Sequence, residues 1–135
     1  MKKLHLAIYT PEGREYTGDV DFVQVQTSES YLGILPGHAP LISDVLISKL
    51  LVRIEGQDIP FAVGEGMLSV KDDEVKLIVS SLEQASEIDI ERALAAKQRA
   101  EDRLAGKLGD LETLDVARAK AALSRALNRI NVSKN

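Results

Sequence analysis

The sequence lacks two residue types and is poor in two others. Its 135 residues include no cysteine and no tryptophan, only two histidines, and 4% aromatic residues. The absence of cysteine excludes disulfide frameworks, thiolate nucleophiles and cysteine-ligated zinc, and is compatible with the cytosol. Two histidines are too few for a histidine-rich metal site.

Long apolar runs are also missing. A membrane span needs about 20 consecutive apolar residues, and the most apolar stretch, residues 41–52, is broken by serine, aspartate and lysine. The two lysines near the N-terminus precede no apolar segment, so we expect neither a secretion signal nor direct membrane insertion. A formal net charge of −4 argues against a general nucleic-acid binder.

The composition changes near residue 84. Residues 1–84 hold 7 basic and 13 acidic residues, together with all four prolines and seven of the nine glycines. Residues 85–135 hold 10 basic and 8 acidic residues and are dominated by alanine, leucine, arginine and glutamate. We expect a β-sandwich domain over 1–84 and an antiparallel two-helix hairpin over 85–135, an α+β chain overall.

Period-two alternation in the first segment predicts a small β-sandwich or barrel. Apolar residues alternate with other residues over 4–8 and 22–27, which is typical of half-buried antiparallel strands. Further strands are expected at 50–54, 59–63, 67–70 and 75–79. Turn residues separate the strands at 11–13, 55–58 and 71–74.

Three-and-four spacing in the second segment predicts two helices. Ser86 and Asp89 fit a capping box, so the first helix is expected to begin at Ser86. Its predicted face comprises Ile90, Ala93, Leu94, Lys97, Ala100 and Leu104, and residues 106–110 form the break. The second helix is expected from about Glu112 to Asn131, capped by Asp110 or Thr113, with a face comprising Leu114, Ala117, Ala121, Leu127 and Ile130.

Alanine is frequent on both predicted helix faces. A methyl group buries much less area than a leucine side chain, whose full burial contributes about 1.5–3 kcal/mol. We therefore expect a weakly packed, mobile hairpin that adopts a second arrangement when a ligand or partner favours it.

Catalytic motifs are scarce. His38 has Ser43 and Asp44 nearby in the sequence, but no nucleophile-elbow spacing surrounds a serine there. The phosphate-binding pattern Gly-x-x-x-x-Gly-Lys-Ser/Thr is absent. We expect a structured loop around His38, and no active site.

Two stretches carry a family resemblance. The first is the loop Leu32-Gly33-Ile34-Leu35-Pro36-Gly37-His38-Ala39-Pro40-Leu41. Together with the plan of sandwich followed by hairpin, it resembles the epsilon subunit of F-type ATP synthases, bacterial type. The second, Ile88-Asp89-Ile90-Glu91-Arg92-Ala93, is similar to the family's nucleotide motif, Ile/Leu-Asp-x-x-Arg-Ala, at every defined position. The resemblance covers the whole chain.

The resemblance implies a non-catalytic rotor subunit of the central stalk in proton-driven ATP synthesis. The sandwich would attach to the gamma subunit and rest on the c ring, at the cytoplasmic face of the bacterial cell membrane. The hairpin would either lie folded on the sandwich or extend along gamma into the alpha/beta head, where it blocks ATP hydrolysis. No cofactor is required; ATP is implied as a regulatory ligand, and the role of magnesium is left open.

The resemblance also implies site residues. Those for ATP are Glu83, Ile88, Asp89, Arg92, Ala93, Arg99, Arg125 and Arg129. Those for the c ring are Glu29, Tyr31, Gly33, Ile34, Leu35 and His38, with Tyr31 standing where many relatives have an acidic residue. Those for the inhibitory contact with an acidic loop of the beta subunit are Arg118, Lys120, Arg125 and Arg129.

The residues themselves support more than one interpretation. Asp89 can bond to the free amides of a helix start or accept a hydrogen bond from an adenine amino group. Arginines from two helices would suit a triphosphate, because a guanidinium binds phosphate oxygens in pairs. The helix dipole favours the same placement of aspartate and arginine without any ligand. A stand-alone nucleotide-sensing or peptide-binding sandwich is therefore an alternative, and an enzyme using His38 is a third.

Overall fold

The computed structural model describes residues 2–106 and 113–134, and the chain divides into two compact units at Gln84 and Ala85. The strands of the first unit are β1 (Leu4–Thr10), β2 (Gly13–Val20), β3 (Phe22–Gln26), β4 (Tyr31–Ile34), β5 (Leu41–Val45), β6 (Ser48–Ile54), β7 (Gln57–Val63), β8 (Gly66–Lys71), β9 (Glu74–Val79) and β10 (Leu82–Gln84). The second unit contains a 3₁₀ turn, η1 (Ala85–Glu87), and two helices, α1 (Ile90–Leu104) and α2 (Thr113–Ser133).

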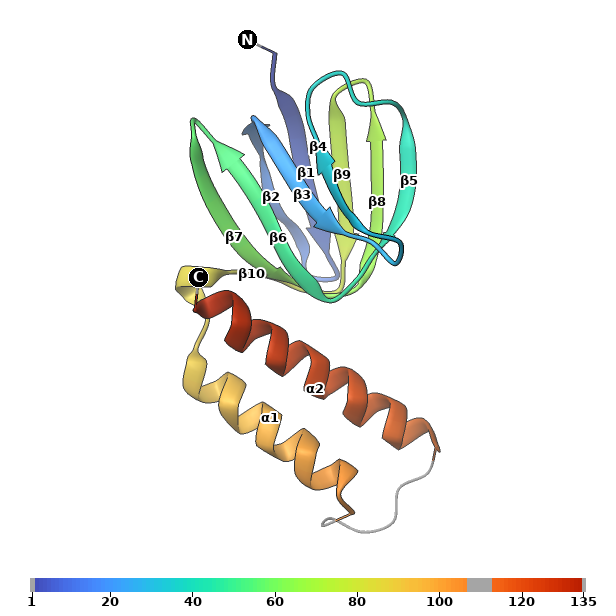
Figure 1. Cartoon of the computed structure of the whole chain (residues 1–135), viewed down its shortest axis with the longest axis vertical. Coiled ribbons are helices and arrows are strands. Elements are labelled where there is room, and N and C mark those ends of the chain that lie inside the picture. Colours follow the sequence, from blue (N-terminus) through green and yellow to red (C-terminus); the bar gives the residue numbers. More distant parts are fainter. Residues whose placement is uncertain (1, 107–112, 135) are drawn as a thin grey trace. The chain divides into compact units, whose positions relative to one another are not determined.

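The strands of the first unit form two five-stranded sheets that face each other (Figure 1). The first sheet has the order β2-β1-β9-β8-β5, and the second has the order β10-β7-β6-β3-β4. All neighbouring strands are antiparallel except β1 and β9, which pair in parallel. The predicted sandwich followed by helices is confirmed.

The core is the layer of aliphatic side chains between the two sheets. On β9, for example, Val75, Leu77 and Val79 are buried whereas the intervening residues are exposed. The alternation predicted over residues 4–8 and 22–27 is confirmed, because these segments supply Leu4, Leu6, Ile8, Val23, Val25 and Thr27 to the buried set. Alternation of this kind places one face of each sheet in the core and leaves the other free for contacts.

Four strands were not among those expected from alternation: β2, β4, β5 and β10. The motif at 32–41, interpreted as a loop, begins inside β4 and ends in β5, so only residues 35–40 are outside the strands. β4 and β10 have four and three residues, too few for a period to be recognised.

The start of α1 differs from the prediction. Residues 85–87 form the turn η1, and the helix begins at Ile90 with Asp89 as its N-cap. The Asp89 carboxylate accepts a hydrogen bond from the backbone amide of Arg92 at 3.1 Å. The predicted start at Ser86 is therefore wrong. Aspartate is as good an N-cap as serine, and the helix uses the second of two acceptable caps that lie three residues apart.

The buried faces of the helices also differ in part from the prediction. On α1, Ala93 and Ala100 are buried, but Ile90 and Leu94 are each 48% exposed. On α2, Ile130 is buried as expected, whereas Ala117 and Leu127 are exposed and the contact is made through Ala119 and Ala126. Alanines are so frequent on α2 that several faces satisfy the same spacing. Asp110 and Glu112 lie outside the described residues, as do the side chains of Thr113 and Leu114.

Asp21 is the single residue between β2 and β3, where the chain passes from one sheet to the other. Its carboxylate accepts hydrogen bonds from Lys3 Nζ at 2.6 Å and from the Glu55 amide at 2.7 Å. The Lys3 hydrogen bond, with help from the Glu55 amide, lowers the pKa of the Asp21 carboxyl below its ordinary value of 3.8 despite some desolvation. Asp21 thus joins the residue before β1, the crossover and the β6–β7 turn.

We predict that Asp21→Asn lowers the urea midpoint of unfolding at pH 7 and weakens its pH dependence. A carboxyl with a lowered folded-state pKa stabilises the fold above its unfolded pKa, near 3.8, and this contribution is lost as the pH falls below that value. The difference between the midpoints at pH 7 and pH 3 should therefore be smaller in the variant. Asp72→Asn is the control, because Asp72 is exposed. The same pH dependence in Asp21→Asn and the parent chain would contradict this role.

Candidate functional site

The two helices of the second unit meet through alanine. The buried alanines are seven residues apart on each helix, Ala93 and Ala100 on α1 and Ala119 and Ala126 on α2. Seven residues are close to two helical turns, so each pair lies on one stripe. Methyl groups at the contact allow the helix backbones to approach closely, and longer side chains are left at the rim.

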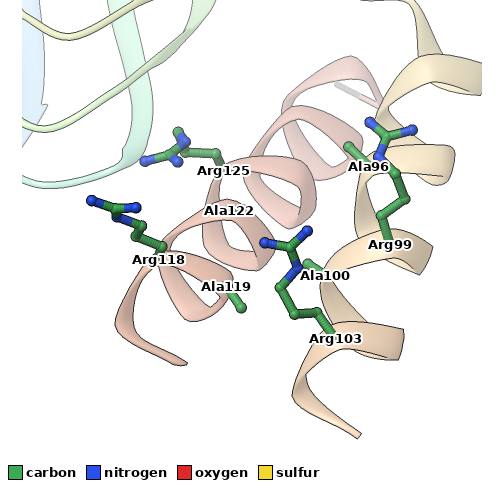
Figure 2. Close-up of a pocket in the computed structure, with 8 residues that line it drawn as sticks. All are labelled: Ala96, Arg99, Ala100, Arg103, Arg118, Ala119, Ala122 and Arg125. Atoms are coloured by element: carbon green, nitrogen blue, oxygen red, sulfur yellow. The ribbon is translucent and has the colours of Figure 1, made fainter. Parts of the chain in front are cut away.

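Beside this contact lies a hollow of about 390 Å³. It is lined by four alanines, Ala96, Ala100, Ala119 and Ala122, and by four arginines, Arg99, Arg103, Arg118 and Arg125 (Figure 2). The volume falls within the range of small-molecule sites, roughly 300–1,000 Å³. Within the part of the chain that the structure describes, the hollow is the place where arginines of both helices gather.

Helical spacing explains why these arginines share the hollow. Arg99 and Arg103 are four residues apart on α1, whereas Arg118 and Arg125 are seven apart on α2 and extend from the same side of that helix (Figure 2). Residues at these spacings lie on one face of a helix. The face that carries the alanines therefore also carries the cations at its edge.

The hollow concentrates positive charge. Like charges four residues apart destabilise a helix by about 0.2–0.5 kcal/mol. Among residues 2–106 and 113–134, no ion pair is found for Arg99, Arg103 or Arg118 that would neutralise them. A ligand carrying several negative charges would remove the repulsion and gain charge-assisted hydrogen bonds, which guanidinium groups form in pairs with phosphate oxygens. The four guanidinium groups are thus chemically able to bind a polyanion.

The predicted ATP residues only partly coincide with this hollow. Arg99 and Arg125 line it, whereas Arg92 and Arg129 lie one or two turns away along their helices and are not among its lining residues. Arg103 and Arg118 line it but were not predicted to bind ATP; Arg118 had been assigned only to the inhibitory contact. The signal that would have found them is their spacing of four and seven residues from Arg99 and Arg125.

The other predicted ATP residues lie near the start of α1 or before it. Ile88 and Ala93 are buried, with 9% and 1% of their surface exposed, and Asp89 caps the helix between them. Glu83 lies in β10, at the end of the first unit. Of the two interpretations of Asp89, the structure shows the one in which its carboxylate bonds to the helix amides.

The predicted c-ring residues cluster on and around β4. Tyr31 and Leu35 are 56% and 58% exposed, and Glu29 is also exposed. Ile34 instead is fully buried in the core, so its side chain is not available for a contact. Gly33 lies against the ring of Phe22, since an added Cβ would be 3.0 Å from that ring. An exposed side chain thus stands at each end of β4: that of Tyr31, its first residue, and that of Leu35, the residue directly after it.

The residues imagined as a hydrolytic trio make other contacts. His38 Nδ1 lies 2.7 Å from the Ala39 carbonyl oxygen, and the Ser43 hydroxyl donates to the Asp44 backbone and side chain. Among the described residues no hydrogen bond joins His38 to Ser43. The residues that the structure describes also contain no cluster of three metal-ligating side chains.

Both units of the chain match family models. Residues 3–85 match the model described as "ATP synthase, Delta/Epsilon chain, beta-sandwich domain". Residues 86–134 match the model described as "ATP synthase, Delta/Epsilon chain, long alpha-helix domain". The two matches together cover nearly the whole chain.

Curated relatives and solved structures agree with these matches. The chain is 42% identical over 135 residues to the ATP synthase epsilon chain of Bacillus velezensis, covering 100% of both, and 40% identical over 133 residues to that of Desulforamulus reducens, covering 98% of each. It shares its fold with a chain of the Euglena gracilis mitochondrial ATP synthase (TM-score 0.77, 20% identity, covering 93% of this chain and 78% of that one). A chain of the Tetrahymena thermophila mitochondrial ATP synthase central stalk and c-ring is also similar (TM-score 0.65, 19% identity, coverage 98% and 97%).

We predict that serine can replace Asp89 as a helix cap but alanine cannot. Asp89→Ala should lower the stability of the hairpin by about 1 kcal/mol, the usual cost of a lost N-cap, whereas Asp89→Ser should retain most of it. Urea titration followed by circular dichroism of the helices measures the difference. If both variants were as stable as the parent chain, the Asp89–Arg92 hydrogen bond would not be a stabilising cap.

Proposed function

The chain belongs to the ATP synthase delta/epsilon family, and from that premise we propose that it is a non-catalytic rotor subunit whose hairpin senses ATP and restrains ATP hydrolysis. The observation that carries the rotor role is the 42% identity to an ATP synthase epsilon chain over the full length of both chains. A match of both units in their order favours a subunit of the complex over a stand-alone sandwich module.

The proposed partners of the sandwich are the gamma subunit and the c ring. The similar solved chains come from assemblies described as containing F1, the c-ring or the central stalk. None of the helices that the structure describes is long and apolar enough to cross a membrane. Exposed apolar residues at β4, such as Leu35, are suited to a peripheral contact with the ring at the cytoplasmic face of the bacterial membrane.

ATP is the proposed ligand of the arginine hollow. Arg99 and Arg125 have both the charge and the placement to bind phosphate oxygens, and the rim arginines Arg103 and Arg118 extend the positive surface. The alanine floor offers apolar contact but no group that would activate water. The hollow is therefore suited to binding ATP without hydrolysing it, and magnesium is not required by any group described there.

Binding by residues of both helices would favour the folded hairpin. A ligand at about 100 times its dissociation constant stabilises the state that alone binds it by about 2.7 kcal/mol. A shift from 1:99 to 99:1 needs about 5.5 kcal/mol. ATP can therefore switch the hairpin only if the folded and extended forms are already close to balance, which a contact made mainly of alanine would permit.

Inhibition would use the basic side chains of α2, which include Arg118, Lys120, Arg125 and Arg129. Exposed ion pairs contribute only about 0–1 kcal/mol each, so several of them and the bulk of the helix would have to act together against an acidic loop of the beta subunit. Arg118 and Arg125 also line the hollow. A nucleotide bound to these two arginines would keep them from the inhibitory contact. ATP binding would therefore relieve the inhibition of ATP hydrolysis.

We predict that Arg99→Ala raises the dissociation constant of ATP by about tenfold or more, because a lost charged hydrogen bond costs about 1.5–3 kcal/mol. Lys120→Ala is the matched control: it removes the same charge from an exposed position that does not line the hollow. Titration calorimetry on the full chain, with and without magnesium, measures both. Equal affinities in the two variants would show that ATP does not bind through the hollow.

We predict that removing the chain after Glu87 raises ATP hydrolysis by the assembled enzyme, since the helices that would enter the head are then absent. Arg118→Ala or Arg129→Ala alone should release hydrolysis only in part, and the combined changes should release more. High salt should weaken the part of the inhibition that depends on charge, because it screens exposed ion pairs. Hydrolysis that stays as low as in the parent enzyme after the truncation would limit this subunit to a coupling role.

A further inference from the structure

β4, which begins at the exposed Tyr31 and ends just before the exposed Leu35, has little support along its length. β4 is four residues long and lies at the edge of the second sheet, where it pairs only with β3. Along its outer edge, such a strand has no neighbouring strand to bond with its backbone N–H and C=O groups. The position of β4 therefore depends strongly on what holds the turns at its two ends.

The turn before β4 is held by Asp44 of β5. The Asp44 carboxylate oxygen Oδ1 accepts hydrogen bonds from the Ser28 amide at 3.3 Å and from the Ser28 hydroxyl at 3.1 Å. These donors, the Ser28 amide first, lower the pKa of the Asp44 carboxyl despite some desolvation. Inside the turn, the buried Thr27 hydroxyl accepts from the amides of Glu29 and Ser30.

The turn after β4 is held by Asp73 of the β8–β9 turn. Its carboxylate Oδ1 accepts a hydrogen bond from the Gly37 amide at 2.7 Å. The Asp73 carbonyl oxygen accepts from the His5 amide at 2.8 Å, so the backbone of this residue is itself fixed to β1. Gly37 has a φ of 88°, which favours glycine at the turn that Asp73 holds.

Both carboxylates come from the sheet opposite β4. β5, β8 and β9 belong to the first sheet, whereas β3 and β4 belong to the second (Figure 1). We propose that Asp44 and Asp73 are positioning residues that fix the two ends of β4 across the sandwich and thereby set the presentation of Tyr31 and Leu35 to the membrane ring. The contact with the ring rests on the proposed function; the clamping of β4 does not.

The backbone at Asp73 allows a clean test. Asp72 and Asp73 have φ values of 51° and 62°, in the left-handed region that glycine and asparagine tolerate. Asp73→Gly removes the carboxylate without backbone strain, and Asp73→Asn retains an oxygen acceptor. Asp72→Gly is the matched control, since it removes the same charge from the adjacent residue, which makes no hydrogen bond to Gly37.

The first measurement is amide hydrogen exchange in the full chain. Asp73→Gly should raise the exchange rate of the Gly37 amide by about tenfold, because its acceptor is a charged oxygen. Asp73→Asn should restore most of the protection, and Asp72→Gly should leave it unchanged. At the other end of β4, Asp44→Ala should raise the exchange rate of the Ser28 amide, and Asp44→Asn should restore most of its protection. Unchanged exchange at Gly37 in Asp73→Gly would overturn the clamp whatever the fate of the ring contact.

The second measurement is proton-driven ATP synthesis by the assembled enzyme. Leu35→Glu, at an exposed position, tests the ring contact itself and should reduce coupling. If it does and Asp73→Gly with Asp44→Ala also does, with rescue by the asparagine variants, the positioning role is supported. If Leu35→Glu reduces coupling but Asp73→Gly and Asp44→Ala do not, the positioning role of the two aspartates is overturned. If Leu35→Glu has no effect while Gly37 exchange rises in Asp73→Gly, the ring contact fails and the clamp stands.

Discussion

Burial of aliphatic side chains between two short-stranded sheets is the interaction on which the sandwich depends. Several strands supply alternate residues, as Val75, Leu77 and Val79 do on β9, and this layer determines which faces and edges remain for contacts with other molecules. The polar connections, such as Asp21 between β2 and β3, then join the sheets at their margins. Groups that would meet a partner are therefore found at edges and turns.

The hairpin follows a different physical rule. Its helices meet through Ala93, Ala100, Ala119 and Ala126, whose methyl groups allow close approach but bury little area. Arginines at the rim of the same contact repel one another. A thin apolar contact with arginines gathered at its rim suits the proposed binding of a ligand of opposite charge. Under the proposed function, the sandwich would supply the attachment to the central stalk and the hairpin would supply the part that moves.

The sequence was sufficient for the sandwich, because alternation follows directly from two-sided strands, and for the existence of two helices. It was not sufficient for the helix faces, because alanines at neighbouring positions fit several stripes equally well. The start of α1 was placed too early since Ser86 and Asp89 both suit a cap. In the site, Arg103 and Arg118 share a helix face with Arg99 and Arg125 by spacing alone, but the meeting of the two faces at one hollow depends on the register between the helices, which no local pattern contains. Ile34 was assigned to a contact although strand alternation turns it into the core.

The parallel pairing of β1 with β9 bears on how the chain is made. β1 lies inside its sheet between β2 and β9, and its register joins Leu6 to Val75. On a ribosome, the first strand must wait until most of the sandwich has been synthesised before it gains this neighbour. Contacts of such long range slow folding, whereas the helical hairpin closes through local ones. The hairpin, which is synthesised after the sandwich, therefore closes quickly, while the sandwich completes the pairing of β1 with β9 only after most of its strands have been made.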